Sequence, residues 1–471
     1  MIYFKIAIAG FILTINLINH VVIVIQYTIL HFIHKEHSMQ KIPFTLLLLT
    51  FSVLISGQNK STGFWTGTMN RDNSIMNVSV EFKPENGKTH GYFNSPSQKA
   101  SGIPLDSVVI NDDTLSFQLM TEPVSYFKCK VYTDKIEGQI IQEGFSTGRL
   151  VIHHSTRPLT TYSFTDTTFE SGKNKIACRI YFPKRDGKFP AVVFMHGSGG
   201  EGMFANQYLA EYLASNGIIT LIQDKQGVGK STGNWTKANF DDLTNDYINA
   251  IACIKKFDKV NQAQIGIYGH SQGGTLAPLL ASKSKDVSFV IAAASVGDTV
   301  FKQDIYRVEN NLKSAEFNPA EIHEAMAYYT SWLNIARTGK GFDKLDSLNQ
   351  LSQDKKWIEW VKAPPKNHWI WNYYLATGNY NSLDYWKKIT VPVLLVYGEN
   401  DQIEDVKTYL HNIDKSINSQ QLNNDVTELI LPHAQHNLCV FPEKNETFFW
   451  WYLSHGYEKL VVSWIAYRFR N

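Results

Sequence analysis

Residues 58–155 contain short runs in which apolar and polar side chains alternate, the pattern of half-buried β-strands. Turn-forming residues separate the runs, as in 84–87 and 111–113, and no helical period is visible. The spacing predicts a small all-β domain, a barrel or sandwich, which we call the β-module (58–155). Its predicted strands are 76–82, 107–110, 114–119, 127–132, 136–141 and 149–152. It carries no catalytic constellation, so we interpret it as a packing or substrate-positioning element.

From about residue 160 to 471 the pattern changes to bounded apolar runs that alternate with helix-like stretches. Such runs are typical of parallel strands that are buried on both faces. The predicted strands are 191–195, 218–222, 265–268, 287–293 and 393–397, and the predicted helices include 207–216, 240–256 and 274–283. This order predicts an α/β domain with a mostly parallel sheet that is covered by helices on both faces.

Residues 298–388 interrupt that rhythm, because they are rich in helix formers and then in aromatic side chains. We interpret them as a helical cap insertion that lies over the carboxyl edge of the sheet. Such an insertion could line a pocket for a small molecule with apolar and aromatic groups. The sequence does not tell which of the aromatic side chains would face that pocket.

The N-terminal region indicates export. Residues 39–57 consist of a short basic start, an apolar core and small residues, which is the pattern of a signal peptide cleaved near Gly57–Gln58. A second apolar stretch at 6–32 would be a membrane helix if residues 1–38 are translated. We favour a start at Met39, and hence a periplasmic or secreted protein without stable membrane association after processing.

Composition narrows the function further. Lys and Arg number 45 against 43 Asp and Glu, a net charge of +2 that gives no reason to expect a nucleic acid partner. The four cysteines form no C-x-x-C pair, which argues against a zinc site, and we expect them to be buried thiols. We expect no metal and no cofactor.

Residues 269–273 read Gly-His-Ser-Gln-Gly and match G-x-S-x-G. The pattern has a steric reason: a serine on a tight strand-to-helix turn needs minimal side chains at Gly269 and Gly273. An apolar run precedes the motif and a helix-like stretch follows it. This context predicts Ser271 as the nucleophile.

A glycine-rich loop with Gly197 and Gly199 follows the predicted strand 191–195. Backbone N–H groups in such a loop can approach a developing oxyanion. We predict that the N–H groups of Ser198 and Gln272 form the oxyanion hole.

The acid and the base are expected in two later loops. Asp401 lies just past the predicted strand 393–397, where a carboxylate can reach the catalytic histidine, although Glu399, Glu404 and Asp405 are neighbouring candidates. After the apolar-rich run 427–431, His433 and His436 both suit the general base.

Together these segments resemble the α/β-hydrolase superfamily, in its esterase, dienelactone-hydrolase and prolyl-oligopeptidase-like branch. The resemblance covers roughly residues 160–471 and rests on 194–200, 224–231, 269–273, 397–401 and 433–437. It favours His436 over His433 and implies the order Ser271, Asp401, His436. Relatives usually have arginine at the position of Gln226, so a salt bridge is expected to be missing there. The opening of the β-module at 65–67 also resembles the domain that precedes exported bacterial hydrolases.

The family implies a two-step acyl-enzyme mechanism. We therefore expect a hydrolase of carboxylic esters that acts on a small-molecule or peptidic acyl substrate. A serine peptidase of the prolyl-oligopeptidase type or an acyl thioesterase would use the same residues. The segment 227–232 resembles part of a phosphate-binding loop, but the first glycine of that pattern is replaced by Asp224, so ATP binding is not expected.

Overall fold

The computed structural model describes residues 61–72, 74–121, 123–441 and 452–469. The predicted signal peptide and the segment before it lie outside these residues. Within the described ranges, no helix has the length and apolar character that crossing a membrane requires.

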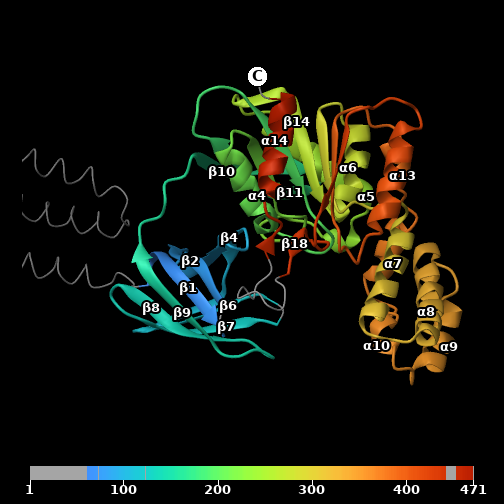
Figure 1. Ribbon diagram of the computed structural model, residues 1–471, viewed down its shortest axis with the longest axis horizontal. Coiled ribbons are helices and arrows are strands. Elements are labelled where there is room, and N and C mark those ends of the chain that lie inside the picture. Colours follow the sequence, from blue (N-terminus) through green and yellow to red (C-terminus); the bar gives the residue numbers. More distant parts are fainter. Residues whose placement is uncertain (1–60, 73, 122, 442–451, 470–471) are drawn as a thin grey trace, which may run out of the picture. The chain divides into compact units, whose positions relative to one another are not determined.

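The β-module forms one antiparallel sheet of nine strands (Figure 1). The strands are β1 (Gly63–Arg71), β2 (Ser74–Glu85), β3 (Lys88–Ser95), β4 (Ala100–Pro104), β5 (Asp106–Asn111), β6 (Thr114–Leu119), β7 (Ser125–Val131), β8 (Lys135–Ile141) and β9 (Gly148–Ser155). Burial alternates along strands such as β2 and β7, so one face of the sheet forms an apolar core around Trp65. The two edge strands, β4 and β5, are separated in the chain by Leu105 alone, so the sheet curls until its edges meet.

The second sheet has eight strands in the order β10-β11-β13-β12-β14-β15-β16-β17. The strands are β10 (Tyr162–Ser171), β11 (Asn174–Pro183), β12 (Phe189–Met195), β13 (Ile219–Gln223), β14 (Val260–His270), β15 (Phe289–Ala293), β16 (Val393–Gly398) and β17 (Val426–Leu431). β10, β11 and β13 pair antiparallel, and the pairs from β13 to β17 are parallel. β12 lies between β13 and β14 and runs parallel to both. The carboxyl ends of β12, β14 and β16 therefore lie along one edge of the sheet.

Helices cover both faces of this sheet. Residues from α4 (Gln207–Ser215) and α14 (Tyr457–Phe469) share one apolar cluster, and these helices neighbour each other in Figure 1. Residues from α5 (Phe240–Ile254), α6 (Gln272–Lys283) and α13 (Val406–Asn418) belong to the other cluster. Successive residues of β12 alternate between the two clusters, since neighbouring side chains on a strand point to opposite faces. Short elements complete the fold: η1 (Met203–Asn206), η2 (Trp235–Lys237), β18 (Cys439–Val440) and β19 (Tyr452–Leu453).

The insertion between β15 and β16 is helical, as the composition of 298–388 predicts. Its helices are α7 (Val300–Ser314), α8 (Pro319–Thr338), α9 (Phe342–Ser352), α10 (Ile358–Val361), α11 (Ile370–Thr377) and α12 (Leu383–Trp386). Capping boxes or proline mark several helix starts: Asn318 caps α8, and Pro319 occupies its first turn. The predicted cap, mostly parallel sheet and preceding all-β region are therefore confirmed.

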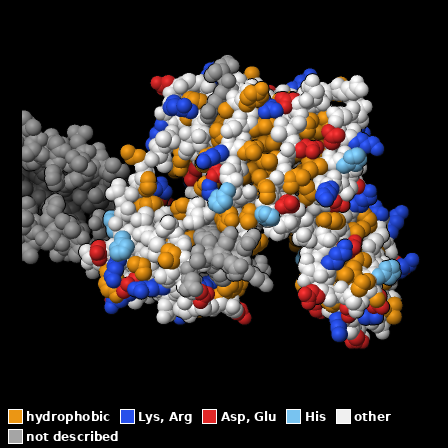
Figure 2. All heavy atoms as spheres, in the orientation of Figure 1, with side chains coloured by type: hydrophobic (Ala, Val, Ile, Leu, Met, Phe, Trp, Pro, Cys, Tyr) orange, Lys and Arg blue, Asp and Glu red, His pale blue; other side chains and the backbone are white. Residues whose placement is uncertain are grey.

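Charges of both signs are mixed on the visible face, and the four cysteines are buried as expected. Figure 2 shows Lys and Arg side chains interspersed with Asp and Glu over the visible face, without a large region of one sign. Cys129, Cys178, Cys253 and Cys439 are free and buried. In the described part of the chain, His, Cys, Asp and Glu do not form a group of three that could hold a metal ion.

Candidate active site

Ser271 occupies the sharp turn between β14 and α6. Its backbone has φ 55° and ψ −117°, a conformation that side chains rarely adopt and that often marks a functional position. A Cβ atom at Gly269 would lie 2.2 Å from the carbonyl carbon of Gly273, and one at Gly273 would lie 2.6 Å from the carbonyl oxygen of Met195. The steric explanation for both motif glycines therefore holds in the fold.

His436 and Asp401 complete a chain of hydrogen bonds that starts at Ser271. His436 Nε2 lies 2.9 Å from Ser271 Oγ, and His436 Nδ1 lies 2.9 Å from Asp401 Oδ2. A carboxylate can only accept, so Nδ1 carries a proton and Nε2 is free to accept the serine proton. The structure thus brings together three residues that are 165 positions apart at most in the sequence.

The Asp401 carboxylate is held in place by the loop after β16. Its side chain has no exposed surface, and its Oδ1 accepts the N–H groups of Ile403 at 2.8 Å and Glu404 at 2.9 Å. These bonds leave Oδ2 directed at His436. A fixed carboxylate both orients the imidazole and stabilises its protonated form.

The alternative candidates lie elsewhere. The His433 side chain is 76% exposed, and its nearest carboxylate partner is Glu399 at 3.6 Å. Asp405 caps α13 by accepting the N–H of Thr408. Glu404 is buried and accepts a hydrogen bond from Gln303, while burial raises its pKa well above the usual range. Geometry therefore selects Asp401 and His436 among the candidates.

The predicted oxyanion residues both line the cavity that contains Ser271. Gln272 is the first residue of α6, so its N–H has no intrahelical acceptor. In the loop after β12, the N–H of Gly197 donates to Glu201 Oε2 at 2.9 Å. The Gly197 amide is thereby occupied, which is consistent with the assignment to Ser198. This oxyanion hole remains a prediction.

Lys225 is a site residue that sequence reasoning missed. Its buried ammonium donates to the carbonyl oxygens of Gly197 at 2.6 Å and Gly199 at 2.8 Å, and to Gln272 Oε1 at 3.3 Å. Burial lowers the pKa of Lys225 to about 8, although the neighbouring Glu201 carboxylate acts in the opposite direction. One side chain thus connects the glycine-rich loop to Gln272, the residue that follows Ser271.

His270, the residue before Ser271, contacts His436 from the other side. Its ring lies 5.2 Å from that of His436, and its Nε2 lies 2.8 Å from the backbone oxygen of His436. Burial, together with the nearby His436, lowers the pKa of His270 to about 4. His270 is therefore neutral at pH 7, and its Nε2–H donates to that carbonyl.

A cavity of about 530 Å³ opens in front of Ser271. Its wall includes apolar and aromatic side chains from the cap, from η2 and from the start of α5: Trp235, Phe240, Val300, Trp369, Ile370, Tyr373 and Tyr374. Only three of the late aromatic residues, Trp369, Tyr373 and Tyr374, line it, whereas Trp357, Trp371 and Trp386 are buried in the core. The cap therefore shapes the pocket, as expected, with a minority of its aromatic side chains.

The cap also places an ion pair in the cavity wall. Arg307 Nε donates to Asp304 Oδ1 at 2.9 Å, and Tyr374 donates its hydroxyl to Asp304 Oδ2. Burial raises the pKa of Asp304, while Arg307 opposes that shift. Both Asp304 oxygens are thus engaged within the cap.

The segment 224–231 places Gln226 beside a buried carboxylate. Gln226 Nε2 donates to Asp246 Oδ2 at 3.0 Å, so a neutral amide rather than a cation contacts Asp246 there. Burial raises the pKa of Asp246. In the same segment, Asp224 accepts the N–H groups of Met203 and Lys230, so a carboxylate of the chain itself occupies these amides.

The α/β domain is similar to known proteins. Residues 188–442 match the family described as serine aminopeptidase, S33. Esterase EstD of Thermotoga maritima is 24% identical over 48% of this chain and 50% of its own length. The quorum-quenching protein AidA of Acinetobacter baumannii is 26% identical over 28% of this chain and 44% of its own length. The chain thus spans about half the length of the curated relatives it matches.

Among solved structures, Est1E from Butyrivibrio proteoclasticus with bound ferulic acid is 18% identical. It covers 64% of this chain and 96% of its own, with a TM-score of 0.40. The family match covers more than half of the chain, and it includes the glycine-rich loop, Ser271, Asp401 and His436. The chain therefore belongs to the serine aminopeptidase S33 family of the α/β-hydrolase superfamily.

Proposed function

We propose that this protein cleaves carboxylic esters through a covalent acyl-enzyme on Ser271. The observation that carries the proposal is the continuous pair of 2.9 Å hydrogen bonds from Ser271 through His436 to Asp401. Such an arrangement activates a serine hydroxyl, which is a weak nucleophile at its ordinary pKa.

In the first half-reaction, His436 Nε2 takes the proton of Ser271 as Oγ attacks the ester carbonyl carbon. The carbonyl oxygen becomes an oxyanion that accepts the N–H groups of Ser198 and Gln272. His436 then gives its proton to the leaving alkoxide oxygen as the bond to that oxygen breaks. In the second half, His436 deprotonates water, which attacks the acyl carbon and releases the acid and Ser271.

The family description makes a serine peptidase the second candidate. An aminopeptidase needs a carboxylate that is free to bind the substrate's ammonium group. In the cavity wall, Asp304 is engaged by Arg307 and Tyr374, and Glu201 accepts the N–H of Gly197 and lies near Lys225. This pairing favours an ester substrate over an aminoacyl peptide.

Substrate profiling tests the assignment. The purified protein is assayed with short p-nitrophenyl esters and with aminoacyl and dipeptidyl p-nitroanilides, each beside Ser271→Ala. We expect ester turnover that the substitution abolishes and little anilide turnover. Comparable ester turnover by Ser271→Ala would contradict the proposal, and preferential anilide cleavage would establish the peptidase.

We further propose that the enzyme is exported and acts on small-molecule acyl substrates outside the cytoplasm. The signal-like pattern of residues 39–57 supports this proposal. N-terminal sequencing of the processed protein should give a chain that begins near Gln58. A mature chain that begins before Met39 would overturn it.

A further inference from the structure

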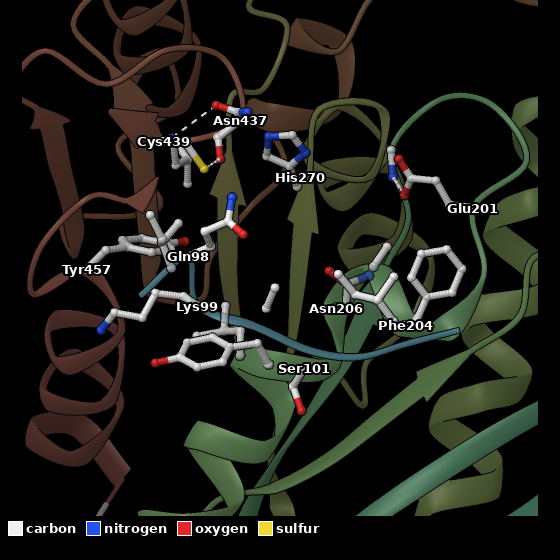
Figure 3. A pocket seen from close by; sticks show the side chains of 18 of the residues that line it. Gln98, Lys99, Ser101, Glu201, Phe204, Asn206, His270, Asn437, Cys439 and Tyr457 are labelled. Atoms are coloured by element: carbon white, nitrogen blue, oxygen red, sulfur yellow. Dashed lines mark hydrogen bonds between the residues drawn. The ribbon is translucent and has the colours of Figure 1, made fainter. Parts of the chain in front are cut away.

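A second cavity, of about 320 Å³, lies between the β-module and the hydrolase fold (Figure 3). The β-module contributes Gln98 and Ser101 to its wall, and the hydrolase fold contributes Asn206 and Asn437. It has no counterpart among the motifs that sequence reasoning identified. We call it the module cavity, and the cavity in front of Ser271 the cap cavity.

The two cavities border each other. Gly197, Glu201 and His270 line both of them. Gly197 belongs to the glycine-rich loop, and His270 directly precedes the nucleophile. Ser271 and His436 line the cap cavity, so the module cavity adjoins the reacting atoms through these three shared residues.

The wall from the β-module is firmly attached at this point. Lys99 forms an ion pair with the buried Glu458 of α14, and Ser101 Oγ donates to Glu211 Oε2 at 2.7 Å. At Gly102, a Cβ atom would lie 2.1 Å from Gln207 Nε2, so the backbone there packs directly against α4. Residues 99–102 thus hold Gln98 in a fixed place.

In the proposed reaction, the acyl group and the alcohol part of the substrate must extend in different directions from the carbon that Ser271 attacks. The tetrahedral carbon is bonded to Ser271 Oγ and to the oxyanion, so its remaining substituents, acyl and alkoxy, point apart. The leaving oxygen must lie near His436, which protonates it. Asn437 directly follows His436 in the sequence, and His270 contacts the backbone oxygen of His436. Asn437 and His270 both line the module cavity.

We propose that the module cavity binds the leaving alcohol, while the cap cavity holds the acyl group. This inference rests on the proposed ester hydrolysis at Ser271. It gives the β-module a direct part in specificity, because Gln98 is a wall residue of the leaving-group site.

The polarity of the module cavity indicates the class of alcohol. Three amide side chains in its wall, Gln98, Asn206 and Asn437, offer both donors and acceptors. In Figure 3 the Gln98 amide points into the cavity, toward the side where His270 lies. The leaving group is therefore an alcohol that bears further hydroxyl groups, such as a sugar or another polyol.

The test compares two acetates that form the same acetyl-enzyme, methyl acetate and a monoacetylated methyl xyloside. Gln98→Trp fills the module cavity, and Gln139→Trp places the same residue on the exposed surface of β8 as a control. We expect Gln98→Trp to lower kcat/KM for the xyloside acetate at least tenfold and to change that for methyl acetate less than twofold. The rate of deacylation, measured after a p-nitrophenyl acetate burst, should stay unchanged, because the alcohol has already left.

Other outcomes distinguish a failure of the leaving-group inference from a failure of the proposed ester hydrolysis. Equal losses for both acetates, no loss for either, or no wild-type preference for the xyloside acetate would overturn the inference while leaving ester hydrolysis intact. Absence of wild-type ester turnover would instead overturn the proposed function. If Gln98→Trp does not fold, Asn206→Trp closes the same cavity from the hydrolase side and must give the same selective loss.

Discussion

The Lys225 ammonium lies 2.6 Å from the Gly197 carbonyl oxygen, so a buried cation holds the loop that carries the predicted oxyanion donor. Lys225→Met should lower kcat/KM for p-nitrophenyl acetate by about tenfold to a hundredfold, since removing one well-placed oxyanion interaction costs up to about a thousandfold. Lys230→Met, which alters an exposed lysine five positions later, should leave the activity unchanged.

The same contact predicts an alkaline limit. The pKa of Lys225 is about 8, so the side chain loses its charge above that pH and its bonds to Gly197 and Gly199 weaken. Wild-type kcat/KM should therefore decline above about pH 8, and Lys225→Arg, which stays charged, should extend the plateau. An identical alkaline limb in Lys225→Met would mean that another group causes it.

The orientation of His436 depends on the carboxylate of Asp401. In Asp401→Asn the amide group can donate to Nδ1, which favours the wrong imidazole tautomer, and kcat should decrease by roughly ten-thousandfold. Thermal unfolding and circular dichroism should match the wild type, which separates the chemical effect from misfolding. Glu399→Gln is the matched control, because Glu399 contacts the exposed His433 rather than His436. A loss of the same size in Glu399→Gln would argue against the assignment.

Buried His270 predicts a specific sensitivity to acid. Its pKa is about 4 in the folded protein, against about 6.5 in an unfolded chain. As the pH falls below 6.5, the unfolded chain binds a proton that folded His270 does not, so the free energy of unfolding decreases until about pH 4. His270→Gln should flatten this decrease in urea unfolding measured from pH 7 to pH 4. Replacing the exposed His90 by glutamine should leave the slope as it is.

The ion pair between Lys99 and Glu458 should anchor the β-module to the hydrolase fold. The Glu458 side chain is 3% exposed, so Lys99→Met leaves a buried carboxylate without its partner, at a cost of about 3 kcal/mol in unfolding free energy. The double variant Lys99→Met/Glu458→Met should recover part of that loss. Chemical denaturation of the three variants measures both effects, and additive losses in the double variant would contradict the coupling.

Strands that are buried along nearly their whole length could be predicted from apolar runs in the sequence. The strand β16 is buried along its whole length, and its apolar run at 393–397 predicts it almost residue for residue. β10 is an exposed edge strand that carries little apolar signal, and β3 and β4 are short of alternating apolar residues. Those three strands were not predicted individually, nor were β1, β11, β18, β19, α13 and α14.

The site divides in a similar way. Ser271, Asp401 and His436 could be predicted because local motifs place them at strand ends in a fixed order. Lys225 and His270 also stand in or beside those motifs, but their importance arises from contacts between segments that are distant in the sequence. The module cavity is lined by Gln98 of the β-module and Asn437 of the hydrolase fold, and no local sequence pattern indicates that these two residues share a cavity.

Covalent labelling tests directly whether Ser271 is the nucleophile. The purified protein is treated with a fluorophosphonate probe, digested and analysed by mass spectrometry, with Ser271→Ala in parallel. We expect one modified peptide, labelled at Ser271 and lost in the variant, with labelling slowed in His436→Gln. Labelling of another serine, or an unmodified Ser271 in a protein that still hydrolyses esters, would contradict it.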